Sequence, residues 1–168
     1  MLQYEMFVNH RVGTYLGAGC FSSAHLMTNG LVCKIGNNDG TRNWLEFCLL
    51  EREAGRLLPL MPEVFTVAAI EGGRYMAVMR KYEGMSDDEN HAGSKVQDHP
   101  NFDAVVKRYG EYMLPAVGNV PWYHLFSDLH AGNTMMCGER GVVITDPSAG
   151  KYANQGHCPD FELAYTVH

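Results

Sequence analysis

Two short segments in the second half of the chain place oxygen-bearing side chains beside apolar runs. In SDLHAGNTMM, residues 127–136, Asp128 and Asn133 lie five positions apart, and Asp146 follows the apolar run GVVIT. The sequence between Asn133 and Asp146 predicts a hairpin of two short strands, which would return Asp146 to the side of Asn133. A carboxylate and an amide oxygen held together are hard ligands, suited to a Mg²⁺ ion that also binds phosphates and water.

The remaining residue of this set, Asp128, would stay available as a general base or as a group that orients a hydroxyl. Asp and Asn residues in loops also form Asx turns, and each of the three residues taken alone fits that structural role. Their joint spacing favours a site that handles a metal ion and a proton.

The first half of the chain contains a glycine pair in the segment LGAGCFSSAH. Gly17 and Gly19 lie where a turn between two strands is predicted, and backbone N–H groups of such a turn can approach phosphate oxygens closely. An ordinary hairpin turn is the alternative interpretation.

Lys34 lies inside the short apolar strand GLVCKIG. A buried cation requires an anionic partner, although a lysine on an edge strand can also extend its head into water. The helix that follows offers three carboxylates as partners: Glu46, Glu51 and Glu53.

Hydrophobic periodicity and turn residues predict the elements that position these groups. In chain order they are a strand-turn-strand over 14–27, a strand over 30–36, a helix over 42–58, a hairpin over 63–82, a polar linker over 83–101, a helix over 102–117, and over 121–150 an apolar strand, a polar loop and two short strands. This order predicts an α+β chain with two lobes, and a cleft between lobes is a natural ligand site.

Composition narrows the classes of function. The net charge of −6 argues against a nucleic-acid binder, which usually carries a basic face. No apolar run is long enough for a membrane span, and the N-terminal residues lack the pattern of a signal peptide. The five cysteines are widely spaced and odd in number, so we expect free thiols in a reducing compartment and a cytoplasmic protein.

Taken in order, these segments resemble the signature set of the protein kinases. GAGCFSSA resembles the glycine-rich loop, LVCK the V-A-I-K strand, SDLHAGN the H-R-D-L-x-x-x-N segment, and TDP stands where D-F-G is expected. YMAVMRKY, residues 75–82, resembles the strand that ends at the kinase hinge. The combination is most similar to the early serine/threonine protein kinases of T-odd podoviruses, which are bacteriophages. The D-L-H-x-G-N form also occurs in aminoglycoside-type phosphotransferases.

The resemblance implies a compact, two-lobed, protein-kinase-like α+β fold. The β-rich N-terminal lobe would span 1–82, the hinge or linker 83–101, and an abbreviated C-terminal lobe 102–168. The abbreviation is expected because only 22 residues follow Asp146 (168 − 146), which leaves no room for the usual helical platform.

The resemblance also implies which residues bind ATP. Gly17, Ala18 and Gly19 would cover the triphosphate, and Met79 and Lys81 would lie at the hinge where the adenine ring binds.

The resemblance further implies which residues bind the metal ion and which residue accepts the proton. Asn133 and Asp146 would hold Mg²⁺, and Asp128 would orient the attacking hydroxyl and accept its proton.

Lys34 would pair with the α- and β-phosphates. The resemblance favours Glu53 as the ion-pair partner of Lys34, with Glu46 as the alternative.

Three positions depart from the kinase pattern. Ser22 stands where a third glycine is usual, and Pro147 replaces the Phe of D-F-G. Ser127 replaces the Arg that reads an activation-loop phosphate in many kinases, so no such switch is expected.

The implied activity is Mg²⁺-assisted transfer of the γ-phosphoryl group of ATP to a Ser or Thr hydroxyl of a host protein. One alternative is a small-molecule phosphotransferase, in which the acidic stretch within 84–103 would bind a cationic substrate. The other is a kinase-fold module that binds and inhibits or recruits a partner protein without chemistry.

Overall fold

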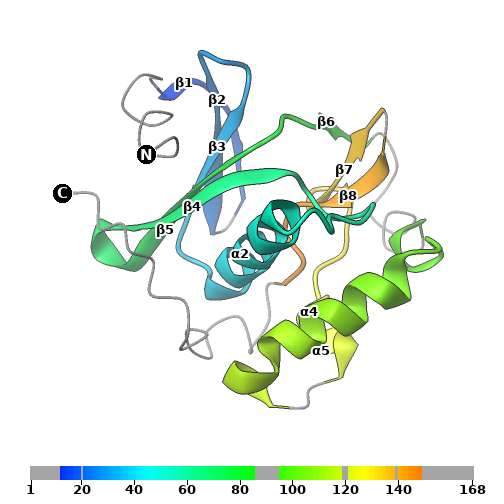
Figure 1. The fold of residues 1–168 in the computed structure, drawn as a ribbon. Helices are drawn as coiled ribbons and strands as arrows, with labels where there is room; N and C mark the ends of the chain where they lie inside the picture. The colour runs from blue at the N-terminus through cyan, green and yellow to red at the C-terminus, as the bar shows by residue number, and fades with distance from the viewer. Residues whose placement is uncertain (1–11, 20, 86–94, 119–120, 139, 149–168) are drawn as a thin grey trace.

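A computed structural model of the chain describes residues 12–19, 21–85, 95–118, 121–138 and 140–148. Within these residues the fold is α+β, with a sheet-rich N-terminal part and few helices, as the sequence predicts (Figure 1). The divisions predicted at 82 and 101 remain predictions.

The N-terminal part is built on an antiparallel sheet. Its strands are β1 (Val12–Ala18), β2 (Ser22–Met27), β3 (Val32–Gly36), β4 (Val64–Ile70) and β5 (Arg74–Met79), in the order β1-β2-β3-β5-β4. The predicted strand-turn-strand, the following strand and the hairpin are therefore all present. The register sets Lys34 of β3 between Ala24 of β2 and Ala77 of β5, so small side chains flank the lysine.

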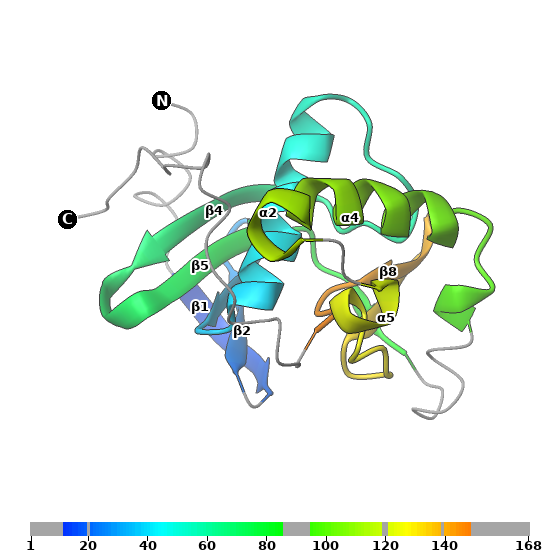
Figure 2. The same cartoon turned by 90° about the horizontal axis from the view of Figure 1, so that it is seen from below.

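Helix α2 (Asp39–Glu53) crosses between β3 and β4 and lies between the sheet and α4, as the two ribbon views show (Figures 1 and 2). It begins three residues before the predicted 42–58 because the Asn38 side chain caps it, accepting the N–H groups of Gly40 (2.8 Å) and Thr41 (3.3 Å). It ends before the predicted stop at Pro59, since Gly55 adopts a left-handed φ of 68° just past its last residue.

The C-terminal part contains a second, smaller sheet in the order β6-β7-β8. Its strands are β6 (Glu83–Gly84), β7 (Thr134–Cys137) and β8 (Gly141–Ile144), and all neighbours are antiparallel. The predicted linker thus begins with a short strand. The second helix, α4 (Phe102–Val117), has the predicted bounds.

One element was predicted wrongly. The apolar residues after position 121 form the short helix α5 (Trp122–Leu125) and not a strand. The N–H of His124 donates to the carbonyl of Pro121 (3.0 Å), so the backbone turns on itself instead of extending.

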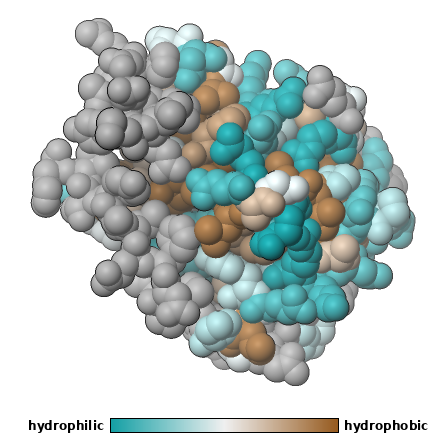
Figure 3. Space-filling view, in the orientation of Figure 1, coloured by the Kyte–Doolittle hydropathy of each residue, from teal (hydrophilic) through white to brown (hydrophobic). Residues whose placement is uncertain are grey.

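The larger of two hydrophobic clusters among the described residues joins both parts of the molecule. Trp44 of α2 is fully buried and contacts Tyr109 of α4 and Phe126 edge-to-face, at ring distances of 5.1 and 5.5 Å. Figure 3 shows hydrophilic residues over much of the face on which α2 and α4 lie, with smaller hydrophobic areas between them.

A backbone bridge also links the two parts. Leu60 pairs in parallel with Val143, and the N–H of Ile144 donates to the Leu60 carbonyl (2.8 Å). Leu60 has a left-handed φ of 63°, a conformation that costs a non-glycine residue about 1 kcal/mol, and its side chain is fully buried.

Three of the predicted free thiols, Cys33, Cys48 and Cys137, are buried and unbonded, while Cys20 and Cys158 lie outside the described residues. Among the helices in the described ranges, none combines the length and the hydropathy that a membrane crossing needs.

Candidate functional site

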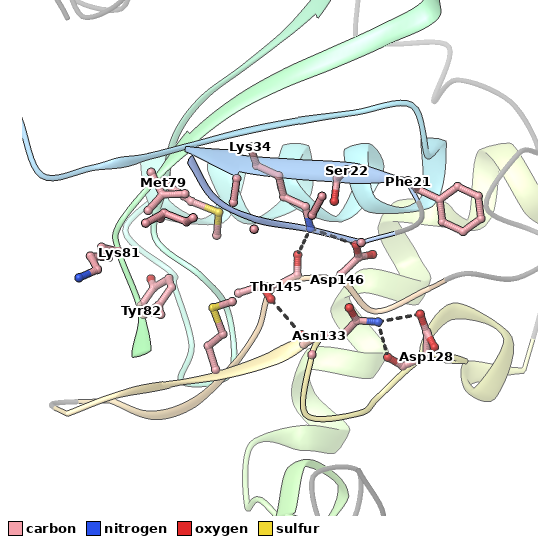
Figure 4. A pocket seen from close by; sticks show the side chains of 18 of the residues that line it. Phe21, Ser22, Lys34, Met79, Lys81, Tyr82, Asp128, Asn133, Thr145 and Asp146 are labelled. Atoms are coloured by element: carbon pink, nitrogen blue, oxygen red, sulfur yellow. Dashed lines mark hydrogen bonds and ion pairs between the residues drawn. The ribbon is translucent and has the colours of Figure 1, made fainter. Parts of the chain in front are cut away.

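A pocket of about 810 Å³ lies between the two sheets (Figure 4). Met79 and Tyr82 lie at one end of the pocket, and Asp128, Asn133 and Asp146 lie toward the other. The lining of the apolar end comes from several strands: Leu16, Ala24, Val32, Met79, Tyr82 and Met135. The pocket therefore combines an apolar slot with a charged end.

Lys34 reaches the charged end from the middle of β3. Its Nζ lies 3.0 Å from Oδ2 of Asp146 and donates to the carbonyl of Thr145 (3.2 Å). The lysine side chain is 11% exposed and the Asp146 side chain 16%. The ion pair accounts for a cation inside an apolar strand, because each charge compensates the other.

Asn133 and Asp146 are neighbours because β7 and β8 form a hairpin, as predicted. The N–H groups of Thr145 and Asp146 both donate to the carbonyl of Asn133, at 2.8 and 3.2 Å. The Thr145 hydroxyl donates to the same carbonyl (3.0 Å). Three donors on one carbonyl fix the start of β7 against the end of β8.

Asp128 lies on the loop before β7, in contact with Asn133. The amide nitrogen of Asn133 donates to Oδ2 of Asp128 (2.6 Å) and to the Asp128 carbonyl (3.0 Å). The N–H of Asp128 donates to the carbonyl of Pro147 (3.0 Å), which joins this loop to the segment after β8. The Asp128 side chain remains 31% exposed, so it can meet a reactant in the pocket.

His130 stands beside the same pair of residues. Its Nε2 lies 2.9 Å from the Asn133 amide nitrogen and 3.5 Å from Oδ1 of Asp128. Its Nδ1 accepts the N–H of Gly132 (3.1 Å). The imidazole therefore helps to hold the loop.

The chemistry of the donor set fits a Mg²⁺ ion that is shared with phosphates. Because the Asn133 amide nitrogen donates to Asp128, the amide oxygen is on the other arm of the side chain and points to the side of Asp146 (Figure 4). In the part of the chain that the structure describes, no three His, Cys, Asp or Glu side chains gather as a metal centre. One carboxylate and one amide oxygen suit Mg²⁺ when a bound substrate completes the coordination.

The turn between β1 and β2 covers the mouth of the pocket. Gly17, Ala18, Gly19, Phe21 and Ser22 all line it, and the N–H of Gly19 donates to the Ser22 carbonyl (2.9 Å). A Cβ at Gly17 or Gly19 would meet no atom within 4 Å. The two glycines thus face open space, where a ligand could approach the backbone.

The structure does not bring Glu53 or Glu46 to Lys34, and the predicted ion pair with an α2 glutamate is corrected to the pair with Asp146. Glu53 is the last residue of α2 and is exposed. Glu46 is buried and lies 3.6 Å from the guanidinium of Arg42, one helical turn earlier. Burial raises the pKa of Glu46 to about 7, against the opposing effect of Arg42.

All the other predicted site residues line the pocket: Gly17, Ala18, Gly19, Lys34, Met79, Lys81, Asp128, Asn133 and Asp146. The acidic stretch proposed for a cationic substrate falls mainly on residues 86–94, outside the described residues.

Sequence reasoning missed the apolar half of the pocket. Ala24, Val32 and Lys34 share one face of the sheet, so the period of two along β3 could have identified Val32. Thr41, whose hydroxyl donates to Oδ1 of Asp146, was also missed. The segment NNDGT predicts a turn, and nothing in it shows that the threonine lies in the first turn of a helix, beside Asp146.

No family model and no curated protein matches this chain. Among solved structures, the chain is similar to the kinase PK-1 of the Cydia pomonella granulovirus, with 15% sequence identity and a TM-score of 0.48. The similarity covers 88% of this chain and 57% of that kinase, so the chain spans just over half the length of the viral protein.

Proposed function

We propose that this chain is a kinase-type phosphotransferase that uses ATP and Mg²⁺. The observation that carries the proposal is the charged end of the pocket, where the Lys34–Asp146 ion pair faces the Asp128–Asn133 pair beside an apolar slot. Phosphoryl transfer depends on positioning and charge neutralisation, and this end of the pocket holds the side chains for both.

Each wall of the pocket has a part in binding the nucleotide. The base would enter the apolar slot between Val32 and Met135, beside Met79 and Lys81, the two residues expected at the hinge. The triphosphate would extend under the turn at Gly17–Gly19 toward the ammonium group of Lys34.

The metal would be held by the Asp146 carboxylate and the Asn133 amide oxygen. When bound there, Mg²⁺ supplies positive charge to the phosphate oxygens and lowers the repulsion that an attacking oxygen meets.

Asp128 is the general base that accepts the proton of the acceptor hydroxyl. The acceptor hydroxyl oxygen forms a bond to the γ-phosphorus while the bond from that phosphorus to the β,γ-bridging oxygen breaks, and ADP leaves with that electron pair. The hydroxyl proton passes to the Asp128 carboxylate and then to water. The amide of Asn133 fixes one carboxylate oxygen of Asp128, which leaves the other side of the group for the acceptor.

The proposed acceptor is a Ser or Thr hydroxyl of a host protein, in line with the resemblance to phage kinases. Transfer of the label to a small cationic molecule would instead identify an aminoglycoside-type phosphotransferase.

The first test uses ATP labelled at the γ-phosphate, Mg²⁺ and a bacterial cell lysate as the source of acceptors. The wild-type protein is compared with Asp128→Asn and with the control Asp103→Asn, which alters an exposed carboxylate on α4 away from the pocket. We expect the wild type and the control to label protein, and Asp128→Asn to lose about 10²-fold or more of the rate while it still binds ATP.

Equal labelling by Asp128→Asn and the wild type would refute the role of Asp128. A wild-type protein that binds ATP and labels nothing would favour the binding-module alternative, and one that binds no nucleotide would refute the proposal as a whole.

A further inference from the structure

We propose that Thr41 is a positioning residue whose hydroxyl orients the Asp146 carboxylate for Mg²⁺–nucleotide binding. It would act as the middle contact of a latch that joins α2 to residues 144–148. The inference rests on the proposed function, and it adds a residue that the kinase signature does not contain.

The latch consists of three side-chain hydrogen bonds from α2 and its N-cap residue. The Asn38 amide donates to the carbonyl of Ser148 (3.0 Å), and the Trp44 indole donates to the carbonyl of Ile144 (2.8 Å). Between them, the Thr41 hydroxyl donates to Oδ1 of Asp146.

The three donors are spaced so that they lie on one face of the helix. Asn38, Thr41 and Trp44 are each three positions apart, and residues at this spacing are neighbours on a helix surface. Their acceptors lie on every second residue of the segment, at 148, 146 and 144. All three donor residues are 5% exposed or less, so water does not compete for these contacts.

The cap of α2 belongs to the same arrangement. The oxygen of the Asn38 side chain accepts the N–H groups of Gly40 and Thr41, while its nitrogen donates to Ser148. One side chain therefore begins the helix and fixes the helix to the segment that carries Asp146.

The two carboxylate oxygens of Asp146 accept hydrogen bonds from side chains that differ in conformational freedom. Oδ2 is bound by Lys34, whose long side chain can turn toward the phosphates of a ligand. Oδ1 is bound by Thr41, a β-branched residue with few rotamers on a capped helix. When Lys34 turns toward phosphate, Thr41 would keep the carboxylate in place for the metal.

The two buried glutamates of α2 have other partners. Glu46 lies beside Arg42, and Glu51 binds Arg56 (2.6 Å) and Arg108 (2.5 Å). The contact between α2 and Asp146 is thus made by a hydroxyl, whereas the kinase resemblance predicts a glutamate that acts through Lys34.

The test measures binding of the non-hydrolysable analogue β,γ-imido-ATP by calorimetry, once with Mg²⁺ and once with EDTA. Thr41→Val removes the hydroxyl at nearly constant shape, Thr41→Ser keeps it, and Thr66→Val is a matched control at a buried threonine of β4 outside the pocket. Thermal melts of all four proteins establish that each is folded.

We expect Thr41→Val to lose about tenfold or more of the affinity with Mg²⁺, since a hydrogen bond to a charged group is removed, and to stay within about twofold of the wild type in EDTA. Thr41→Ser and Thr66→Val should match the wild type in both conditions to within about threefold.

If Thr41→Val does not fold, Asn38→Ser carries the test, because serine also caps helices but lacks the amide that binds Ser148. The affinity of Asn38→Ser for the analogue should fall by roughly threefold when Mg²⁺ is present, and only then.

Equal losses with Mg²⁺ and in EDTA, or no loss at all, would overturn the latch while the proposed function stands. A wild-type protein that binds the analogue in neither condition would overturn the proposed function and the latch together.

Discussion

Lys34 and Asp146 lie 112 positions apart in the sequence, and their side chains meet at 3.0 Å in the wall of the pocket. The pair joins β3 of the larger sheet to the segment after β8 of the smaller one. The same two groups are those proposed to bind the phosphates and the metal, so the contact that stabilises the fold also holds the reactive groups in place.

This double role can be tested with Lys34→Met. The substitution should abolish ATP turnover and destabilise the protein by about 3 kcal/mol, because it leaves the Asp146 carboxylate largely buried without its cation. Urea unfolding measures the stability, and γ-phosphate transfer measures the activity. The double variant Lys34→Met/Asp146→Asn should regain part of the stability and none of the activity; additive losses of stability would show that the two side chains do not interact.

The burial of Glu46 predicts that the stability of the protein changes with pH. Burial raises its pKa from 4.5 to about 7 in the folded protein, so the folded state holds this proton more tightly than the unfolded state. The contribution of Glu46 to stability is therefore full below pH 4.5 and is lost as the pH rises through 7, a change of about 3 kcal/mol.

The measurement is urea unfolding of the wild type and of Glu46→Gln at pH 5 and pH 8. Glu46→Gln should gain stability relative to the wild type between these two values, since glutamine cannot ionise. A constant difference between the two proteins would contradict the burial of an ionisable group at this position.

Glu53→Gln, at the exposed end of α2, should leave nucleotide affinity within about twofold, as expected for a surface change.

The apolar slot can be narrowed through Ala24, which lies opposite Lys34 on the neighbouring strand and lines the pocket. Ala24→Leu should weaken nucleotide binding by about tenfold or more, because the added atoms fill the space proposed for the base. Ala69→Leu, at an exposed position of β4, is the matched control and should bind as the wild type does. Unchanged binding by Ala24→Leu would place the base elsewhere.

Gly36 ends β3 where no side chain fits. A Cβ there would lie 2.7 Å from the Tyr75 hydroxyl and 2.8 Å from the Phe21 carbonyl. Burial, together with the charge of Asp146, raises the pKa of the Tyr75 phenol. Gly36→Ala should cost about 2 kcal/mol of stability and shift the turn that covers the pocket.

Gly110 of α4 is the contrasting control for that experiment, since a Cβ there meets nothing within 4 Å. Gly110→Ala should stabilise the protein by roughly 0.5–1 kcal/mol, because alanine is the better helix former. Thermal unfolding of both variants gives the comparison, and a stabilising Gly36→Ala would mean that the packing around Tyr75 is looser than the structure indicates.

The sequence was a good guide where a local pattern fixes geometry. Alternating apolar residues and glycine turns predicted the strands of the larger sheet, and the two short strands predicted between Asn133 and Asp146 form the hairpin of β7 and β8. The hairpin brings Asn133 to Asp146, whereas the approach of Lys34 to this pair also depends on the tertiary contacts that join the two sheets.

The sequence was a poor guide where tertiary contacts decide between local options. Asn38 and Thr41 belong to a segment with turn composition, and it becomes a helix start because its side chains find partners at Ser148 and Asp146. The partner of Lys34 was predicted wrongly for a related reason, since α2 presents the Thr41 hydroxyl to Asp146 and its two buried glutamates, Glu46 and Glu51, to arginines.

The parallel bridge between Leu60 and Val143 bears on how a ligand enters and leaves. The two sheets are joined at this bridge and also through the covalent segment from β5 to β6, so a rotation about one connection is opposed by the other. Among the residues that the structure describes, the β1–β2 hairpin pairs with the rest of the sheet along one edge, through β3, and its Leu16 and Phe21 are each 46% exposed at the pocket mouth. We therefore expect the molecule to behave as a rigid frame with one mobile flap, so that the bending of this hairpin sets the rate of nucleotide exchange.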